Sequence, residues 1–208
     1  LSEEPAFDLD VKYAGENVAS KLARIREEMK EAGTNVHVVS TIDDICWTLN
    51  IRGNDIDFFP LVLSYGIITM DSFELYIDER KLDDKLKAKL AKDGVNLHPY
   101  NDIYEDVKKF GSDVVAMIDP GKLNYALFNN IPENVKTVKK RNPAILMKAV
   151  KNPVEIENIR KAQIKDSVAH VRFMKWLKEN VGKMKITEMS ASDKLDEFRA
   201  EMGNFIRP

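Results

Sequence analysis

The sequence has little cysteine, no long apolar run and no excess of charge of either sign. Its single cysteine, Cys46, excludes an internal disulfide framework and suits a reducing compartment, so we predict a cytoplasmic protein. No apolar stretch approaches the ~20 residues that span a bilayer. The first residues also lack the basic and apolar pattern of a signal peptide. The sequence therefore indicates neither a membrane protein nor a secreted disulfide scaffold.

The charges of the chain nearly balance. Its 32 Lys and Arg face 34 Asp and Glu, which gives a net charge of -2, and the two signs are interspersed. A broad basic surface for nucleic acid or for anionic membranes is therefore not expected. With 208 residues, 44% of them hydrophobic and 32% charged, the chain reads as a soluble globular protein.

The common catalytic motifs are missing as well. There is no H-E-x-x-H or paired-cysteine spacing for zinc, no G-x-S-x-G elbow and no glycine-rich phosphate loop. We therefore interpret the three histidines as structural or exposed, and three further residues as lacking the context of a nucleophile. These residues are His37, His98 and His170, and Ser40, Ser64 and Cys46.

Four aspartates are expected near the ends of sheet strands: Asp43, Asp44, Asp78 and Asp119. Carboxylates that meet at one sheet edge can hold two divalent metals for phosphodiester cleavage. Aspartate also has local reasons to occupy turns and helix caps. A two-metal nuclease is therefore kept as an alternative, which the lack of positive charge disfavours.

Hydrophobic periodicity alternates between helices and strands over the first ~140 residues. Helices are predicted at 17–32, 81–92, 103–110 and 124–129, and strands at 36–40, 61–69, 73–78, 95–100 and 114–118. Residues 41–44 resemble a helix-opening turn, and the bulky apolar segment 45–51 that follows is interpreted as an aromatic apolar strand. The pattern predicts a mixed α/β sandwich around one sheet, in which 61–69 and 73–78 form an antiparallel hairpin.

We divide the chain into a connecting arm (1–16), an α/β domain (17–141), a linker (142–151) and the incomplete start of a second domain (152–208). Asn152 as N-cap and Pro153 at the first helical position begin a long helix that ends near Gly182, and Thr187 opens another. Two helices cannot enclose a core of their own. The last segment is therefore expected to need a partner surface, which suggests that the chain is a fragment of a longer protein.

Arg52 lies in the segment Arg52-Gly53-Asn54-Asp55, which we expect to be a loop at a sheet edge. The planar fork of a guanidinium suits the recognition of a carboxylate. The alternative is a surface turn with an Arg–Asp pair.

Several segments, in order, resemble the three-domain Xaa-Pro aminopeptidases (aminopeptidase P). They are Ser40-Thr41-Ile42-Asp43-Asp44-Ile45-Cys46-Trp47-Thr48-Leu49-Asn50-Ile51-Arg52-Gly53-Asn54-Asp55-Ile56, Leu63-Ser64-Tyr65, His98-Pro99-Tyr100, Lys148-Ala149-Val150-Lys151-Asn152-Pro153-Val154-Glu155 and Ser190-Ala191-Ser192-Asp193-Lys194-Leu195-Asp196-Glu197-Phe198-Arg199. The resemblance covers nearly the whole chain. One departure is Phe59-Pro60, where the family often has Asn-Pro before the buried strand.

The resemblance implies a creatinase N-terminal-like fold, a ribonuclease-H-like mixed-sheet sandwich, followed by the first two helices of a truncated pita-bread domain. It implies a parent metallopeptidase that removes the residue preceding proline from peptides, as a homodimer. In the family, two divalent ions, expected to be Mn²⁺, are held by two Asp, one His and two Glu.

None of those five metal ligands can be placed in this sequence. The fragment is therefore expected to be noncatalytic and metal-free, with Arg52 as a candidate residue at the parent's substrate entrance. A binding or scaffolding module of the same fold is the second hypothesis.

Overall fold

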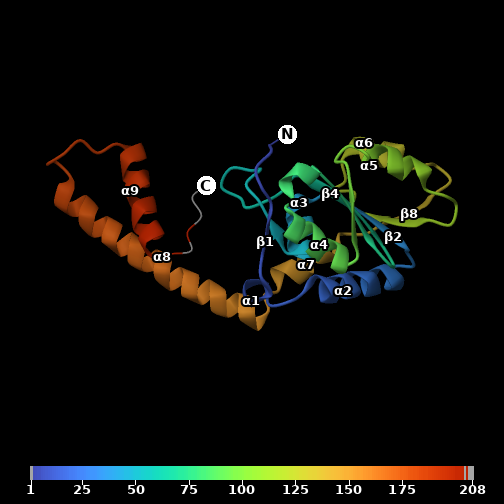
Figure 1. The fold of residues 1–208 in the computed structure, drawn as a ribbon, viewed down its shortest axis with the longest axis horizontal. Coiled ribbons are helices and arrows are strands. Elements are labelled where there is room, and N and C mark those ends of the chain that lie inside the picture. The colour runs from blue at the N-terminus through green and yellow to red at the C-terminus, as the bar shows by residue number, and fades with distance from the viewer. Residues whose placement is uncertain (1, 204, 206–208) are drawn as a thin grey trace. The chain divides into compact units, whose positions relative to one another are not determined.

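The computed structural model describes residues 2–203 and residue 205, and it divides into two units (Figure 1). The first unit ends at Asn152 and the second begins at Pro153. The first unit is built on a six-stranded sheet in the order β6-β5-β4-β2-β7-β8. The strands are β2 (Val36–Val39), β4 (Ser64–Thr69), β5 (Phe73–Ile77), β6 (Val95–His98), β7 (Val115–Ile118) and β8 (Lys136–Lys139).

The sheet is mixed, as the sequence predicts. β4 pairs antiparallel with both β2 and β5, whereas β5–β6, β2–β7 and β7–β8 are parallel pairs. The β4–β5 pair confirms the predicted hairpin. At Gly66 of β4, a Cβ atom would lie 2.6 Å from the Phe73 ring across the pair, so the ring packs where only glycine leaves room.

Helices cover both faces of this sheet (Figure 1). One face carries α2, α3, α4 and α7, and the other carries α5, α6 and the 3-10 turn η2. A short helix, α1, and a second 3-10 turn, η1, complete the helical elements of this unit. Their bounds are α1 (Val11–Ala14), α2 (Val18–Glu31), α3 (Ile42–Leu49), η1 (Glu79–Lys81), α4 (Asp84–Lys92), α5 (Ile103–Asp106), η2 (Val107–Lys109), α6 (Tyr125–Asn130) and α7 (Pro143–Ala149).

Helix α2 shows why the capped and periodic segments were predictable. The Asn17 side chain accepts a hydrogen bond from the Ser20 amide at 2.8 Å, which caps the first turn. The apolar residues recur every three or four positions and are all buried against the sheet: Val18, Leu22, Ile25 and Met29. The predicted helix at 17–32 is therefore confirmed.

The predicted strand at 45–51 is wrong, because most of this segment belongs to helix α3. A short continuous apolar run does not distinguish a buried strand from a buried helix. The helix ends at Asn50, which adopts the left-handed conformation at φ 52°. Lys21 donates to the Trp47 carbonyl at 2.8 Å and to Asn50 Oδ1 at 2.6 Å, so a buried ammonium from α2 caps this end.

Arg52 therefore follows a helix. It lies in β3 (Ile51–Arg52), which pairs antiparallel with β1 (Phe7–Asp8) in a separate two-stranded sheet. The segment 1–16, assigned as a connecting arm, thus contributes β1 and α1 to the first unit. Likewise, the segment 142–151, assigned as a linker, contains α7, whose Ala144 is buried in the core.

The second unit consists of two helices, α8 (Pro153–Asn180) and α9 (Glu188–Glu201). The predicted start of α9 is confirmed, since the Thr187 and Ser190 side chains form a reciprocal capping box. Arg199 donates to Asp166 at 2.7 Å and joins the two helices. Within the described part of this unit, Ala169 is the only buried residue.

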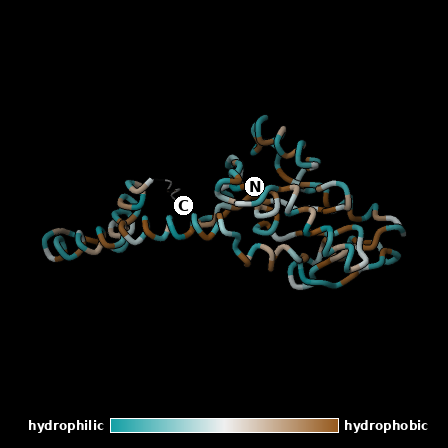
Figure 2. The backbone as a smooth tube through the Cα atoms, turned by 90° about the horizontal axis from the view of Figure 1, so that it is seen from below, coloured by the Kyte–Doolittle hydropathy of each residue, from teal (hydrophilic) through white to brown (hydrophobic). Residues whose placement is uncertain are grey.

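Apolar residues remain exposed along this unit. Hydrophobic and hydrophilic residues alternate along its backbone in Figure 2. Ile164, Val168 and Val171 recur at helical spacing on α8 and are 66%, 42% and 70% exposed. The expectation that these helices need a partner surface agrees with this stripe.

Candidate functional site

Two neighbouring parallel strands, β2 and β7, end at the same edge of the sheet. The chain leaves β2 through α3 and returns at β4 on one side. It leaves β7 through α6 and returns at β8 on the other side. The loops after β2 and β7 therefore diverge to opposite faces. In open α/β sheets, such a switch point at the carboxyl ends of strands is where ligand-binding crevices form.

A cleft of 390 Å³ lies at this switch point. Its walls carry three acidic and three basic side chains, with a threonine and an isoleucine between them. The lining residues are Thr41, Asp43, Asp44, Asp119, Lys122, Arg141, Ile145 and Lys148. This volume is within the range of small-molecule sites, although the lining is more polar than is usual for them.

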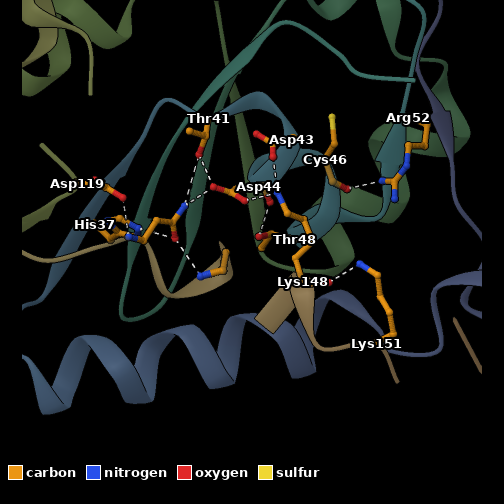
Figure 3. A network of polar contacts seen from close by, with 12 residues as sticks. His37, Thr41, Asp43, Asp44, Cys46, Thr48, Arg52, Asp119, Lys148 and Lys151 are labelled. Atoms are coloured by element: carbon orange, nitrogen blue, oxygen red, sulfur yellow. Dashed lines mark hydrogen bonds and ion pairs between the residues drawn. The ribbon is translucent and has the colours of Figure 1, made fainter. Parts of the chain in front are cut away.

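Asn142, at the N-cap of α7, is buried at the centre of a polar network, whose members Asp44, Asp119 and His37 are labelled in Figure 3. Its Nδ2 donates to Asp44 Oδ2 at 2.9 Å, and its Oδ1 accepts from the Ala144 amide at 3.0 Å. Its backbone amide donates to Asp119 Oδ2 at 2.9 Å. The Asn142 side chain therefore joins α7 to α3, and the Asn142 backbone amide joins α7 to the loop after β7.

Lys148 closes the same network from the last turn of α7. Its ammonium donates to Asp44 Oδ1 at 2.7 Å and also binds Asp43 (Figure 3). Burial lowers the pKa of Lys148, but the hydrogen bonds that it donates to the two carboxylates, together with their negative charges, outweigh burial, so its pKa is raised. Thr41 Oγ1 also donates to the Asp44 carboxylate, to Oδ2 at 2.6 Å.

His37, on β2, is a fully buried member of this network. Its Nδ1 is 3.1 Å from the Met117 carbonyl oxygen, and its Nε2 is 3.2 Å from Asn142 Oδ1. Burial lowers the pKa of His37 and outweighs the two hydrogen bonds, which raise it. The ring is therefore neutral at pH 7, and a neutral imidazole can donate to only one of these oxygens.

The structure brings together three of the four predicted aspartates. Asp43, Asp44 and Asp119 line the cleft, whereas Asp78 caps η1 and pairs with Arg80 at 2.6 Å. Within residues 2–203 and 205, no three His, Cys, Asp or Glu side chains gather in a way that could hold a metal ion. The two-metal nuclease hypothesis therefore receives no support from this cluster.

Arg52 and Asp55 have separate structural partners. Arg52 is half-buried, and its Nη1 donates to the Cys46 carbonyl at 2.9 Å and to the Ile51 carbonyl at 2.8 Å. Asp55 is buried and pairs with the equally buried Lys81 at 2.5 Å. The Asp55 Oδ1 atom has no hydrogen-bond partner among the described residues. These contacts fix both ends of the loop that leads to Val62.

The other candidates have local roles. Ser40 Oγ donates to the Lys122 carbonyl at 2.8 Å, and Ser64 Oγ donates to the Val62 carbonyl at 3.1 Å. Burial raises the pKa of the Cys46 thiol, which makes it a poor nucleophile.

The two remaining histidines lie outside the cleft. His98 binds Glu74 at 2.6 Å and stacks on Tyr76. His170 is exposed on α8, and Asp166, four residues before it, binds Arg199.

Sequence reasoning missed Asn142, Lys122, Arg141 and Lys148. A signal for the first was present, because Asn142-Pro143 repeats the N-cap and proline pattern that predicted α8 at Asn152-Pro153. Lys148 was expected in a linker and in a family-like segment, and no site role was predicted for it, for Lys122 or for Arg141.

Comparisons with known proteins give one consistent result. The family model described as the creatinase/prolidase N-terminal domain matches residues 1–155. A probable Xaa-Pro aminopeptidase P of Neurospora crassa is 35% identical over 98% of this chain and 31% of its own length. Xaa-Pro aminopeptidase 1 of Dictyostelium discoideum is 37% identical over 96% of this chain and 32% of its own length.

The crystal structure of the X-prolyl aminopeptidase of Caenorhabditis elegans matches with a TM-score of 0.92 at 30% identity. The match covers 98% of this chain and 34% of that protein, which is described as a cytosolic enzyme with a di-nuclear active site. The chain thus spans about a third of the length of the relatives it matches. In the described residues, no helix is both long and apolar enough to cross a membrane.

Proposed function

Because the chain belongs to the creatinase/prolidase N-terminal domain family, we propose that it is the noncatalytic part of a metal-dependent Xaa-Pro aminopeptidase. The parent removes the first residue of a peptide when proline follows it. The observation that carries this proposal is the similarity to two Xaa-Pro aminopeptidases over at least 96% of the chain. The match to the Caenorhabditis elegans enzyme also includes residues of both units.

The proposed division of labour assigns the metals to another part of the parent. The carboxylates and histidines of the described residues do not fit a pair of divalent ions, because no three of them are placed so that they could hold a metal ion, and Lys148 binds both Asp43 and Asp44. No catalytic step is therefore assigned to these residues. We propose that the parent binds two divalent ions, Mn²⁺ or a similar metal, as the di-nuclear site of the Caenorhabditis elegans enzyme suggests.

The second unit is proposed to be the start of the catalytic domain. The exposed stripe of Ile164, Val168 and Val171 supports this assignment, since a stripe of this kind is buried when a helix packs in a larger domain. The further proposals are a cytosolic location, proline-containing peptides as substrates, and a homodimeric parent.

Arg52 is proposed to lie at the parent's substrate entrance. Arg52 also has a structural role, because its guanidinium donates a hydrogen bond to the Cys46 carbonyl in the last turn of α3. Arg52→Lys in the parent would keep the charge and lose the fixed fork. A rise in KM without loss of folding supports the entrance role, whereas unchanged kinetics contradict it.

The test of the proposed function compares the parent with this chain. With Mn²⁺, the parent should release the first residue from a tripeptide that has proline second, and should not act on the same peptide with alanine second. The 208-residue chain should do neither. A metal-loaded parent that cleaves neither peptide, but whose N-terminal part folds as described, would favour the scaffolding module instead.

A further inference from the structure

Lys122 and Arg141 are exposed side chains of the cleft at the ends of β2 and β7, and neither forms an ion pair with a carboxylate of the described residues. We propose that this cleft binds small molecules that carry a carboxylate or phosphate group, through Arg141 and Lys122. Neither the proposed peptidase activity nor the metal ions are needed for this binding. A test of anion binding is therefore independent of whether the parent is a peptidase.

Of the three cations that line the cleft, Lys148 is paired with carboxylates, whereas the other two form no ion pair among the described residues. Lys148 is neutralised by Asp43 and Asp44, both of which it contacts directly. Among the described residues, by contrast, no carboxylate lies within ion-pair distance of Lys122 or Arg141, although both line the same cleft. An anion that enters the cleft would thus meet two cations without breaking an existing pair.

The acidic groups of the cleft already have donors. Asp44 accepts hydrogen bonds from Thr41, Asn142 and Lys148. Asp119 accepts one from the Gly121 amide at 3.0 Å on Oδ1 and one from the Asn142 amide on Oδ2. These carboxylates are stabilised by the protein itself, so their repulsion of an incoming anion is partly offset.

Both cations extend from backbone that is held in place. The carbonyl of Lys122 accepts from Ser40 Oγ at 2.8 Å, which ties the loop after β7 to the loop after β2. Arg141 directly precedes Asn142, whose amide and side chain are fixed by Asp119 and Asp44. A site whose supports are already ordered spends less free energy on ordering when a ligand binds.

The position of the cleft independently favours a ligand. It lies where the chain turns to opposite sides of the sheet after two adjacent parallel strands. Its volume of 390 Å³ accommodates a molecule of amino-acid or short-peptide size. A guanidinium beside an ammonium suits carboxylate and phosphate oxygens, and both anions are tested below.

The experiment is a titration of the ¹⁵N-labelled 208-residue chain, followed by NMR, at low ionic strength, where such contacts are least screened. The probes are inorganic phosphate, the dipeptide Gly-Pro with a free carboxylate, and the same dipeptide as its amide. We expect shifts of the backbone amides around Thr41, Lys122 and Arg141. Phosphate binding alone or dipeptide binding alone supports the site and identifies the anion that it takes.

The test variant is the double substitution K122A/R141A, and the matched control is K136A/K139A. The control removes two exposed lysines of β8 that do not line the cleft, so the net charge changes equally. Affinity should fall at least about tenfold in the test variant and stay at the wild-type value in the control. Unchanged amide spectra away from the cleft verify that both variants fold.

Three results would overturn the proposal. The first is that neither anion shifts the cleft amides of the wild-type chain. The second is that the control weakens binding as much as K122A/R141A, which would mean general charge attraction. The third is that phosphate does not bind and Gly-Pro amide binds as tightly as Gly-Pro with its free carboxylate, because binding would then not depend on an anionic group.

Discussion

Substitution of Asn142 by alanine tests whether the polar network around this residue stabilises the first unit. The change removes four side-chain contacts: the cap of the Ala144 amide, the donor to Asp44, the long contact to Thr41 and the oxygen beside His37. Loss of an N-cap costs about 1 kcal/mol. Leaving a buried polar group without its partner costs about 1–3 kcal/mol more. We therefore expect a loss of about 2–4 kcal/mol in the free energy of unfolding.

A matched control separates the cap from the network. Asn17 caps α2 through the same kind of hydrogen bond, to the Ser20 amide at 2.8 Å, but its side chain is exposed. N17A should therefore lose only about 1 kcal/mol. The informative quantity is the difference between the two variants, because it cancels the contribution of the cap.

The assay is urea unfolding followed by tryptophan fluorescence. The chain has two tryptophans, Trp47 in the first unit and Trp176 in the second. In a W176F background the signal reports the first unit alone, since Trp47 is buried there. If N142A costs no more than N17A, the network contributes nothing and the reasoning is wrong. A double-mutant cycle with H37L should show coupling of about 0.5–3 kcal/mol, as expected for residues in contact.

Three further predictions concern other contacts. Hydrogen bonds from Arg80 lower the pKa of Asp78 to about 2. The pair therefore stabilises the fold fully above pH 3.8, and this stabilisation is lost as the pH falls through about 2. R80A should raise the pKa toward 3.8 in an NMR titration of the carboxyl carbon, and an unchanged pKa would contradict this. K81M should cost about 3–5 kcal/mol in urea unfolding because it leaves Asp55 buried without its cation, and D55L in the K81M background should recover most of this loss. T187A should speed hydrogen exchange in the first turn of α9 by removing its capping box, whereas T187S should not.

The fold was predictable where local signals and packing agree. Helix α2 combines an N-cap asparagine with a buried apolar stripe, and the β4–β5 hairpin combines a turn with strand-like runs. The error at 45–51 has a physical cause. Helix α3 is buried on most of its surface, so its residues show almost no polar face from which a period could be read.

The candidate site was predictable only in part. Asp43, Asp44 and Asp119 were expected at strand ends, and parallel pairing of β2 and β7 brings them to one edge. Their partners were not predictable in the same way. Asn142 lies 105 residues after His37 and 98 residues after Asp44, and nothing local in the sequence indicates that they meet.

Residues 142–152 form the end of the first unit and lead directly to Pro153, where the second unit begins. This segment is held to the rest of the first unit at its start by Asn142, in its middle by Lys148, and at its end by Asn152, whose Nδ2 donates to the Ala14 carbonyl at 2.8 Å. Contacts at both ends and in the middle leave it little freedom as a linker. Because Arg141 adjoins this segment and Lys148 belongs to it, an anion in the cleft would contact the same segment that leads to Pro153. Binding of an anion there should therefore stabilise α7 against local unfolding. Because such coupling is reciprocal, a substitution that destabilises α7 should also weaken anion binding.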